Sequence, residues 1–227
     1  MEDSRLPLNK EYKLVHFRQR YDWDCGISCI LMVVSALSRE YIVNHFDEIR
    51  KEEGFGSSTW TIDLCYILKR FNVTHKYLTK TIGVDPKYIE HSYYTPIIER
   101  DQERVKLRFE QAEAKGINVE KKTVKFDAII RHLSKYGPVI LLTNAALLTC
   151  DNCKRKDEQK QSPSRYLGHY VVICGYDLIK RKVLYRNPAQ DDHVCVTSVD
   201  AMDRARKAYG TDEDVIFIYY RSKSWNF

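Results

Sequence analysis

Hydrophobic and polar positions follow a helical pattern through most of the first half of the chain. Residues 26–37 are apolar on nearly every side, which is typical of a helix buried all round rather than of an amphipathic surface helix. Residues 57–71 place apolar side chains at helical spacing, and weaker helical patterns cover 99–115 and 127–136. A single strand-like alternation interrupts them at 73–83. The first half is therefore predicted to be mainly helical.

The second half of the chain has the pattern of strands. A short apolar run at 138–144 suits a buried strand, and 169–177 is the strongest strand pattern in the sequence. Residues 182–188 are its expected antiparallel neighbour, and 212–220 form a last strand. Helices in front and strands behind predict an α+β fold, in which a helical N-terminal lobe with a buried central helix packs on a C-terminal antiparallel sheet.

One domain is expected over residues 1–227, a length that suffices for a single well-packed core. Residues 1–14 are interpreted as a loose lead-in, about 15–136 as the mainly helical lobe, and about 137–227 as the mainly β lobe. No repeat of solenoid length and no low-complexity tract divides the chain further. The pattern does not predict an oligomeric state.

The distribution of charge along the chain argues against binding to nucleic acid. The net charge is +6 and is spread along the chain. The densest basic stretch, at Lys121, Lys122 and Lys125, is short and has no interleaved aromatic residues. A solvated surface explains it better than a groove for nucleic acid.

Neither a membrane span nor a secretory leader is expected. No run approaches the roughly 18 apolar residues that a transmembrane helix needs. The first 14 residues are polar and lack the apolar core of a signal peptide. Because seven cysteines are an odd number in a chain without an export signal, reduced thiols are expected, with a cytoplasmic or nuclear location.

Cys25 is the first candidate for chemistry, because it stands where the buried helix begins. Free backbone N–H groups at a helix start favour a thiolate and lower the pKa of a thiol. Asp24 is a plausible N-cap, and the Gln19 amide could donate to an oxyanion beside the sulfur. The alternative is that Cys25 is a small buried hydrophobe, which is how Cys29 is interpreted.

His169 and Asn187 supply the partners that a nucleophilic thiol needs. His169 opens the strongest strand, and Asn187 closes the strand expected beside it, so the hairpin should make them neighbours. An asparagine there can hold an imidazole in one orientation and tautomer. The order Cys, His, Asn and the spacing from Cys25 to His169 agree with the separation of about 130–150 residues in papain-type enzymes.

Several motifs resemble known families. The segment QRYDWDCGISC resembles the Gln-x5-Cys-Gly opening of bacteriocin-processing and related papain-like cysteine peptidases, and GHYVVICGYD with YRNP resembles their later elements. A narrower resemblance covers nearly the whole chain: the guanylyl cyclase domain-containing protein 1 family of animals and plants is similar in WDCGISC, STWTIDLCYIL, TIGVD, LGHYVVICGYD, YRNPA and YGTDEDVIFIY. The resemblance implies a papain-like fold and carries Gln19, Cys25, His169 and Asn187 onto the peptidase-type site. The bacterial peptidases usually have Asp where Asn187 stands.

Three functions remain open from the sequence. The residues favour a thiol hydrolase or peptidase acting on a peptide or other amide or acyl substrate, without a cofactor. The family name implies conversion of GTP to cyclic GMP, for which the acids at 191–192 and 212–214 could hold metal, although loop and cap roles explain them more simply. The third is a non-catalytic protein that binds a protein partner in a peptidase-like cleft.

Cys150 and Cys153 form a Cys-x-x-Cys pair in a polar loop. One such pair is half of a zinc site, and no second pair stands at the usual spacing. Cys174 and Cys195 are distant candidates, but Cys174 fits a strand core. The sequence therefore predicts a loop thiol pair without metal.

Overall fold

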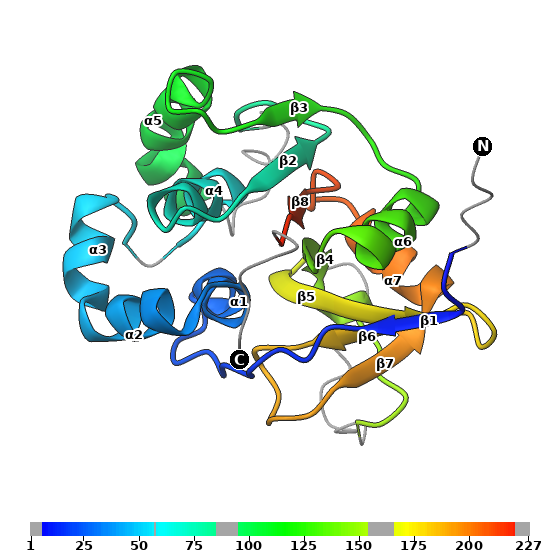
Figure 1. The fold of residues 1–227 in the computed structure, drawn as a ribbon. Helices are drawn as coiled ribbons and strands as arrows, with labels where there is room; N and C mark the ends of the chain where they lie inside the picture. The colour runs from blue at the N-terminus through cyan, green and yellow to red at the C-terminus, as the bar shows by residue number, and fades with distance from the viewer. Residues whose placement is uncertain (1–5, 57, 85–94, 154–165, 221–227) are drawn as a thin grey trace, which may run out of the picture.

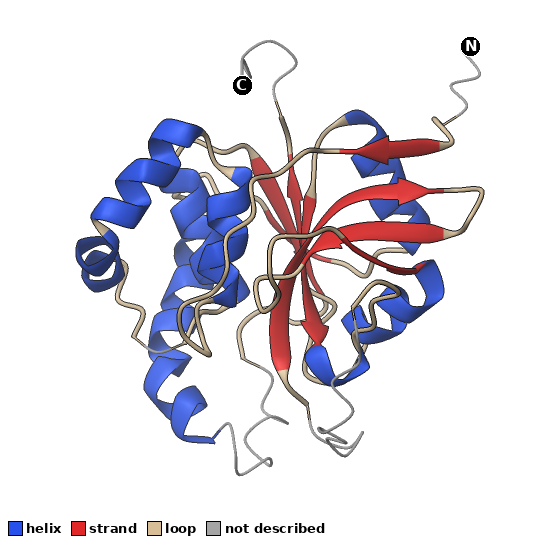
Figure 2. Ribbon diagram, turned by 90° about the horizontal axis from the view of Figure 1, so that it is seen from below, coloured by secondary structure: helices blue, strands red, loops and turns tan. Residues whose placement is uncertain are grey.

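A computed structural model describes residues 6–56, 58–84, 95–153 and 166–220 of the chain. The described part is a mixed α and β structure whose sheet has eight strands. Helices cover both faces of the sheet, so that the sheet lies between two helical layers (Figures 1 and 2). The α+β class predicted from the sequence is confirmed.

The helices divide between the two faces of the sheet. The first five in chain order form the larger layer, and the last two lie on the opposite face (Figures 1 and 2). In chain order the helices are α1 (Cys25–Val33), α2 (Ala36–Asn44), α3 (Phe46–Glu52), α4 (Thr61–Arg70), α5 (Thr95–Gln111), α6 (Phe126–Lys135) and α7 (Val199–Arg206).

The strands pair in the order β3-β2-β8-β4-β5-β6-β7, and β1 pairs with β5 off this path. Neighbouring strands are antiparallel, except that β2 and β3 are parallel. The strands are β1 (Asn9–Glu11), β2 (His75–Thr79), β3 (Val119–Lys121), β4 (Val139–Asn144), β5 (Gly168–Asp177), β6 (Lys182–Arg186), β7 (Cys195–Ser198) and β8 (Val215–Ile218).

The strand β5 connects the two cores of the molecule. Successive side chains of a strand point to opposite faces. Accordingly Tyr170 and Val172 pack with the core that contains α1 and α4, whereas Val171 and Ile173 pack with the core beneath α6 and α7. A strand buried on both faces has no polar alternation, which is why 169–177 has so strong an apolar pattern.

Two expectations about the layout are corrected. The first and second halves of the chain do not form a separate helical lobe and β lobe. The strands β2 and β3, from the first half, extend the same sheet, because β2 pairs with β8. The helix expected over 26–37 ends at Val33, and Ser35 begins α2 by accepting a hydrogen bond from the Ser38 backbone N–H. A new N-cap therefore divides one apolar run into two helices.

The expectation of a loose lead-in over 1–14 is also wrong for its described part. Residues Asn9–Glu11 form β1 and pair antiparallel with the end of β5. The two backbones approach closely at Gly175, where a Cβ atom would lie 2.3 Å from the Lys10 carbonyl oxygen. Only glycine fits at such a position, so the N-terminal strand is part of the sheet.

No helix in the described ranges combines the length and the apolar character that crossing a membrane requires. The loops 83–98 and 150–167, on which the shape of a substrate pocket would depend, fall partly on residues 85–94 and 154–165, and these lie outside the described part of the chain.

Candidate functional site

Cys25 is the first residue of α1, as the sequence predicts. Asp24 stands at the N-cap position, as predicted, but its carboxylate makes no capping hydrogen bond to the helix. It accepts hydrogen bonds from the backbone N–H groups of Arg20 and Tyr21, at 3.1 and 3.0 Å. Asp24 thus closes the loop that leads into the helix and fixes where Cys25 begins it.

The Cys25 sulfur is nearly enclosed, with 5% of the residue exposed. Burial raises the pKa of this thiol to about 11, although the backbone N–H groups of Tyr170 and Gly26 act in the opposite direction. The expectation of a lowered pKa at the helix start is therefore wrong for the free protein. Desolvation outweighs the helix terminus, and Cys25 rests as a neutral thiol.

The helix α1 packs directly against the start of β5. A Cβ atom on Gly26 would lie 3.0 Å from the Leu64 side chain and 3.1 Å from the Tyr170 ring. The backbone of Tyr170 also hydrogen-bonds the Cys25 sulfur. This packing holds the Cys25 thiol beside Tyr170, which directly follows the predicted base His169 in the chain.

His169 and Asn187 are joined by a hydrogen bond of 2.8 Å between His169 Nε2 and Asn187 Oδ1. The Asn187 oxygen also accepts a hydrogen bond from the Ala189 backbone N–H, at 3.0 Å. An atom that accepts from a backbone N–H is the amide oxygen, so His169 Nε2 carries the hydrogen and Nδ1 has the lone pair. The predicted adjacency is confirmed, and the pairing fixes one tautomer of the ring.

The His169 ring is buried and uncharged at rest. Burial lowers the pKa of the imidazole, and the hydrogen bond that the ring donates to Asn187 only partly offsets this effect. A neutral imidazole with a free Nδ1 can accept a proton. Within the described residues, no hydrogen bond joins the His169 ring directly to the Cys25 sulfur.

Gln19 lies beside the loop that carries Asn187. Its backbone N–H donates to the Pro188 carbonyl oxygen at 2.9 Å. One hydrogen of its side-chain Nε2 is engaged with the Tyr21 carbonyl oxygen at 2.7 Å, and its Oε1 is buried without a partner. The amide is thus held in one orientation, and its second hydrogen is the one that could serve an oxyanion.

A buried polar network that the sequence did not predict supports the start of β5 from the side of α4. The Tyr170 hydroxyl hydrogen-bonds Thr61 Oγ1 at 2.8 Å, and Thr61 Oγ1 also contacts Asp214. Tyr77 donates to the other oxygen of Asp214 at 2.9 Å. Burial raises the pKa of Asp214 to about 7. This network joins α4, β5, β2 and the residue before β8. It therefore holds in place the start of β5, against which α1 and Cys25 pack.

The acids considered as metal ligands have other partners. Asp191 forms an ion pair with Arg18 at 2.9 Å, and Asp192 with Arg186 at 2.7 Å. Asp214 is buried in the network described above. These contacts explain Asp191 and Asp192 as loop residues, as the simpler interpretation of the sequence has it, and Asp214 as a core residue rather than a helix cap.

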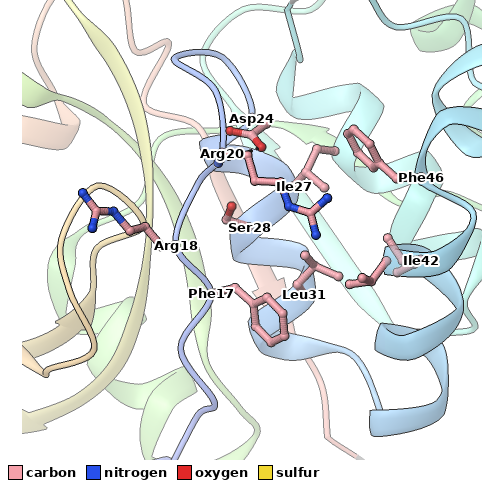
Figure 3. A pocket seen from close by; sticks show the side chains of 10 residues that line it. Phe17, Arg18, Arg20, Asp24, Ile27, Ser28, Leu31, Ile42 and Phe46 are labelled. Atoms are coloured by element: carbon pink, nitrogen blue, oxygen red, sulfur yellow. Dashed lines mark hydrogen bonds between the residues drawn. The ribbon is translucent and has the colours of Figure 1, made fainter.

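A small pocket of ≈ 30 Å³ lies between the segment leading into α1, α1 itself and the helices α2 and α3 (Figure 3). Phe17, Leu31 and Ile42 form its apolar part, and Arg20 and Asp24 lie at its other end, whereas Arg18 extends away from it. Cys25, His169 and Asn187 do not line it. This pocket is therefore separate from the thiol and its partners.

The structure also brings together, at the β7 edge of the sheet, four side chains of the types that bind metals. These are Cys150, Cys153, His193 and Cys195, and their ligand atoms all lie within 4.8 Å of one another. From the sequence, Cys195 is only a distant candidate for this group and His193 is not predicted to belong to it. The signal that could have found them is the pair His193-x-Cys195, which complements the Cys-x-x-Cys pair about 40 residues earlier.

Comparison with known proteins adds a family relationship. A sequence model of the guanylylate cyclase family matches residues 14–218. Guanylyl cyclase 1 of Arabidopsis thaliana is 33% identical over an alignment of 223 residues, which covers 95% of this chain and 79% of the plant protein. Among solved structures, a C39-like peptidase of Bacillus anthracis is similar over 44% of this chain, with a TM-score of 0.30 and 22% identity. The similar region is about half, 49%, of that peptidase.

Proposed function

The chain belongs to the guanylylate cyclase family, and we propose that it acts as a cysteine-dependent hydrolase or acyl transferase on an amide or acyl substrate, most simply a peptide. Cys25 is the proposed nucleophile, His169 the proposed base, and Asn187 the residue that positions His169. Gln19 and the backbone N–H of Cys25 are the proposed oxyanion donors. The site needs no bound cofactor for this chemistry.

The observation that carries the proposal is the hydrogen bond of 2.8 Å between His169 and Asn187. It leaves Nδ1 of His169 as the only ring nitrogen able to accept a proton. The Ala189 backbone N–H donates to the same Asn187 oxygen and so holds the partner of His169 in place. The arrangement supports a ring held ready for proton transfer.

In the proposed reaction, the Cys25 sulfur attacks the substrate carbonyl carbon while its proton passes to His169 Nδ1. The leaving group takes that proton as the carbon–heteroatom bond breaks, and a thioester remains on Cys25. Water, deprotonated by His169, then releases the acid and restores the thiol. Because both groups are neutral at rest, the sulfur loses its proton during the attack rather than before it.

The proposal includes a finer description of the fold, which is papain-like. Two features support it: the nucleophile begins a central helix, and that helix packs on the strand that carries the base.

A second candidate function comes from the name of the plant relative, which calls that protein a guanylyl cyclase. A cyclase acting through metal needs ligands for the ion and a base for the ribose hydroxyl. The contacts of Asp191, Asp192 and Asp214 with other residues favour the thiol chemistry over this alternative.

The test is labelling of the protein by an electrophilic acyl or amide probe directed at thiols. We expect Cys25→Ala to abolish labelling and Cys29→Ala to leave it intact, since Cys29 is fully buried on the same helix. Equal labelling of the Cys25→Ala protein would reject the hydrolase.

The same two variants discriminate the alternatives. A guanylyl cyclase would form cyclic GMP from GTP in a metal-dependent manner, and the activity would survive Cys25→Ala. A non-catalytic protein would show an unreactive Cys25 and no product in either assay. Only the hydrolase predicts a thioester on wild-type Cys25.

A further inference from the structure

Four side chains from two distant parts of the chain meet at the edge of the sheet, and we propose that they bind one structural zinc ion. Cys150 and Cys153 follow the short helix Ala145–Leu147 that leaves β4, whereas His193 and Cys195 stand at the start of the edge strand β7. This site is independent of the proposed hydrolase chemistry.

The distances between ligand atoms, all within 4.8 Å, bracket those around a single tetrahedral ion. The Cys153 and Cys195 sulfurs are 3.7 Å apart, and His193 Nε2 lies 3.1 and 3.4 Å from them. A zinc ion with bonds of about 2.3 Å to sulfur and 2.0–2.1 Å to nitrogen has ligand atoms roughly 3.5–3.8 Å apart. An iron–sulfur cluster would hold its cysteines further apart than one ion does.

The types of ligand select zinc among the common ions. Three thiolates and an imidazole are soft or borderline donors that suit zinc and not Mg²⁺ or Ca²⁺. Four protein ligands fill a tetrahedral site and leave no position open for water. The ion is therefore structural rather than catalytic.

The surrounding hydrogen bonds hold the two segments in place from both sides. The Asp151 backbone N–H donates to the Val196 carbonyl oxygen at 2.7 Å. The Tyr185 hydroxyl donates to the Thr149 carbonyl oxygen at 2.8 Å. The first cysteine pair is thus fixed on the edge of the sheet, so the ligands are arranged before an ion binds.

The ion would crosslink the segment after β4 to the turn between β6 and β7. All the cysteines in the described residues are free thiols, so no disulfide there performs this task. The crosslinked turn also begins with Asn187, the partner of His169. Zinc would therefore stabilise the loop on one side of the proposed active site without entering its chemistry.

The first test is the metal content of the wild-type protein, purified in reducing buffer without a histidine tag. We expect about one zinc per chain by elemental analysis. After exchange into cobalt, the protein should show the visible absorption of tetrahedral Co²⁺ and a sulfur-to-metal charge-transfer band. Zinc well below one per chain together with no tetrahedral cobalt spectrum would overturn the proposal, as would a disulfide between Cys150 and Cys153 in the freshly purified protein.

Variants test which residues hold the ion. Cys153→Ser and His193→Ala should each lose most of the zinc, whereas the control Cys65→Ala, at a buried cysteine of α4, should keep it. His193→Cys should retain the ion in a four-sulfur site and shift the cobalt spectrum, which a merely structural histidine would not do. Unchanged zinc content in Cys153→Ser and His193→Ala would contradict the assignment, and the wild-type measurement decides the case if these variants do not fold.

Discussion

The protein places its sulfur atoms in two contrasting environments. Cys25 is a single thiol enclosed between α1 and β5, where its raised pKa keeps it protonated. Cys150, Cys153 and Cys195 gather with His193 at the edge of the sheet, where several donors converge on one point. A lone thiol suits attack on a carbonyl where an oriented histidine can take its proton, which is the role proposed for His169, and converging sulfurs suit a metal. The number and placement of neighbours, rather than the cysteine itself, assign the chemistry.

The largest effect is expected for His169, the proposed base of the thiol site. His169→Gln removes the proton acceptor and should lower the rate of acylation of Cys25 by roughly 10²–10⁴-fold, which is the usual contribution of a general base. The rate is measured by stopped-flow or quenched labelling with an acyl probe. His45→Gln, on a half-buried ring between α2 and α3, is the matched control and should leave the rate unchanged. A His169→Gln protein as fast as wild type would remove the contrast between the two regions.

The next effect is the pH dependence of simple alkylation at Cys25. A thiol pKa of about 11 means that the thiolate fraction rises with pH throughout the range below it. Alkylation by iodoacetamide should therefore accelerate by roughly 100-fold from pH 7 to pH 9, without a plateau. The rate constant is followed by mass spectrometry of the peptide that contains Cys25. A plateau near neutral pH would indicate a preformed thiolate and imidazolium pair instead.

A smaller effect is expected at the positioning residue. Asn187→Ala leaves the buried His169 Nε2–H without an acceptor, at a cost of about 1–3 kcal/mol, and should reduce acylation by roughly tenfold or more. Asn187→Asp retains an oxygen acceptor and should restore most of the rate. Equal loss in both variants would mean that the residue acts on the fold and not on the ring.

The last prediction is that a change at Cys25 has no effect on the zinc content, which would show that the thiol site and the proposed metal site are independent. Cys25→Ala removes the proposed nucleophile but touches no ligand of the proposed metal site. The variant should therefore retain about one zinc per chain while it loses labelling. Loss of zinc in Cys25→Ala would show that the two sulfur sites are not independent.

Local sequence patterns sufficed for the elements that carry the thiol site. The helix beginning at Cys25, the strand beginning near His169 and its hairpin with the strand before Asn187 were predictable, because each depends on apolar periodicity and short-range pairing. The adjacency of His169 and Asn187 followed from the hairpin alone. The papain-like description and the catalytic roles remain proposals.

The rest depended on contacts that periodicity does not encode. The helices over 36–52 are polar and half-exposed, and β1, β3 and β7 have only three or four residues. The addition of β2 to the sheet requires pairing with β8, which is distant in the chain. The same distance concealed the meeting of His193 and Cys195 with the first cysteine pair. The depth of burial at Cys25, which reverses the expected direction of its pKa, also becomes visible only in three dimensions.

The most direct test of the central claim is peptide mapping of wild-type protein after brief exposure to an acyl probe. The account predicts a thioester on Cys25, with Cys150, Cys153 and Cys195 unmodified while the metal is bound. Acylation confined to those three cysteines, or no acylation of Cys25 at all, would contradict it.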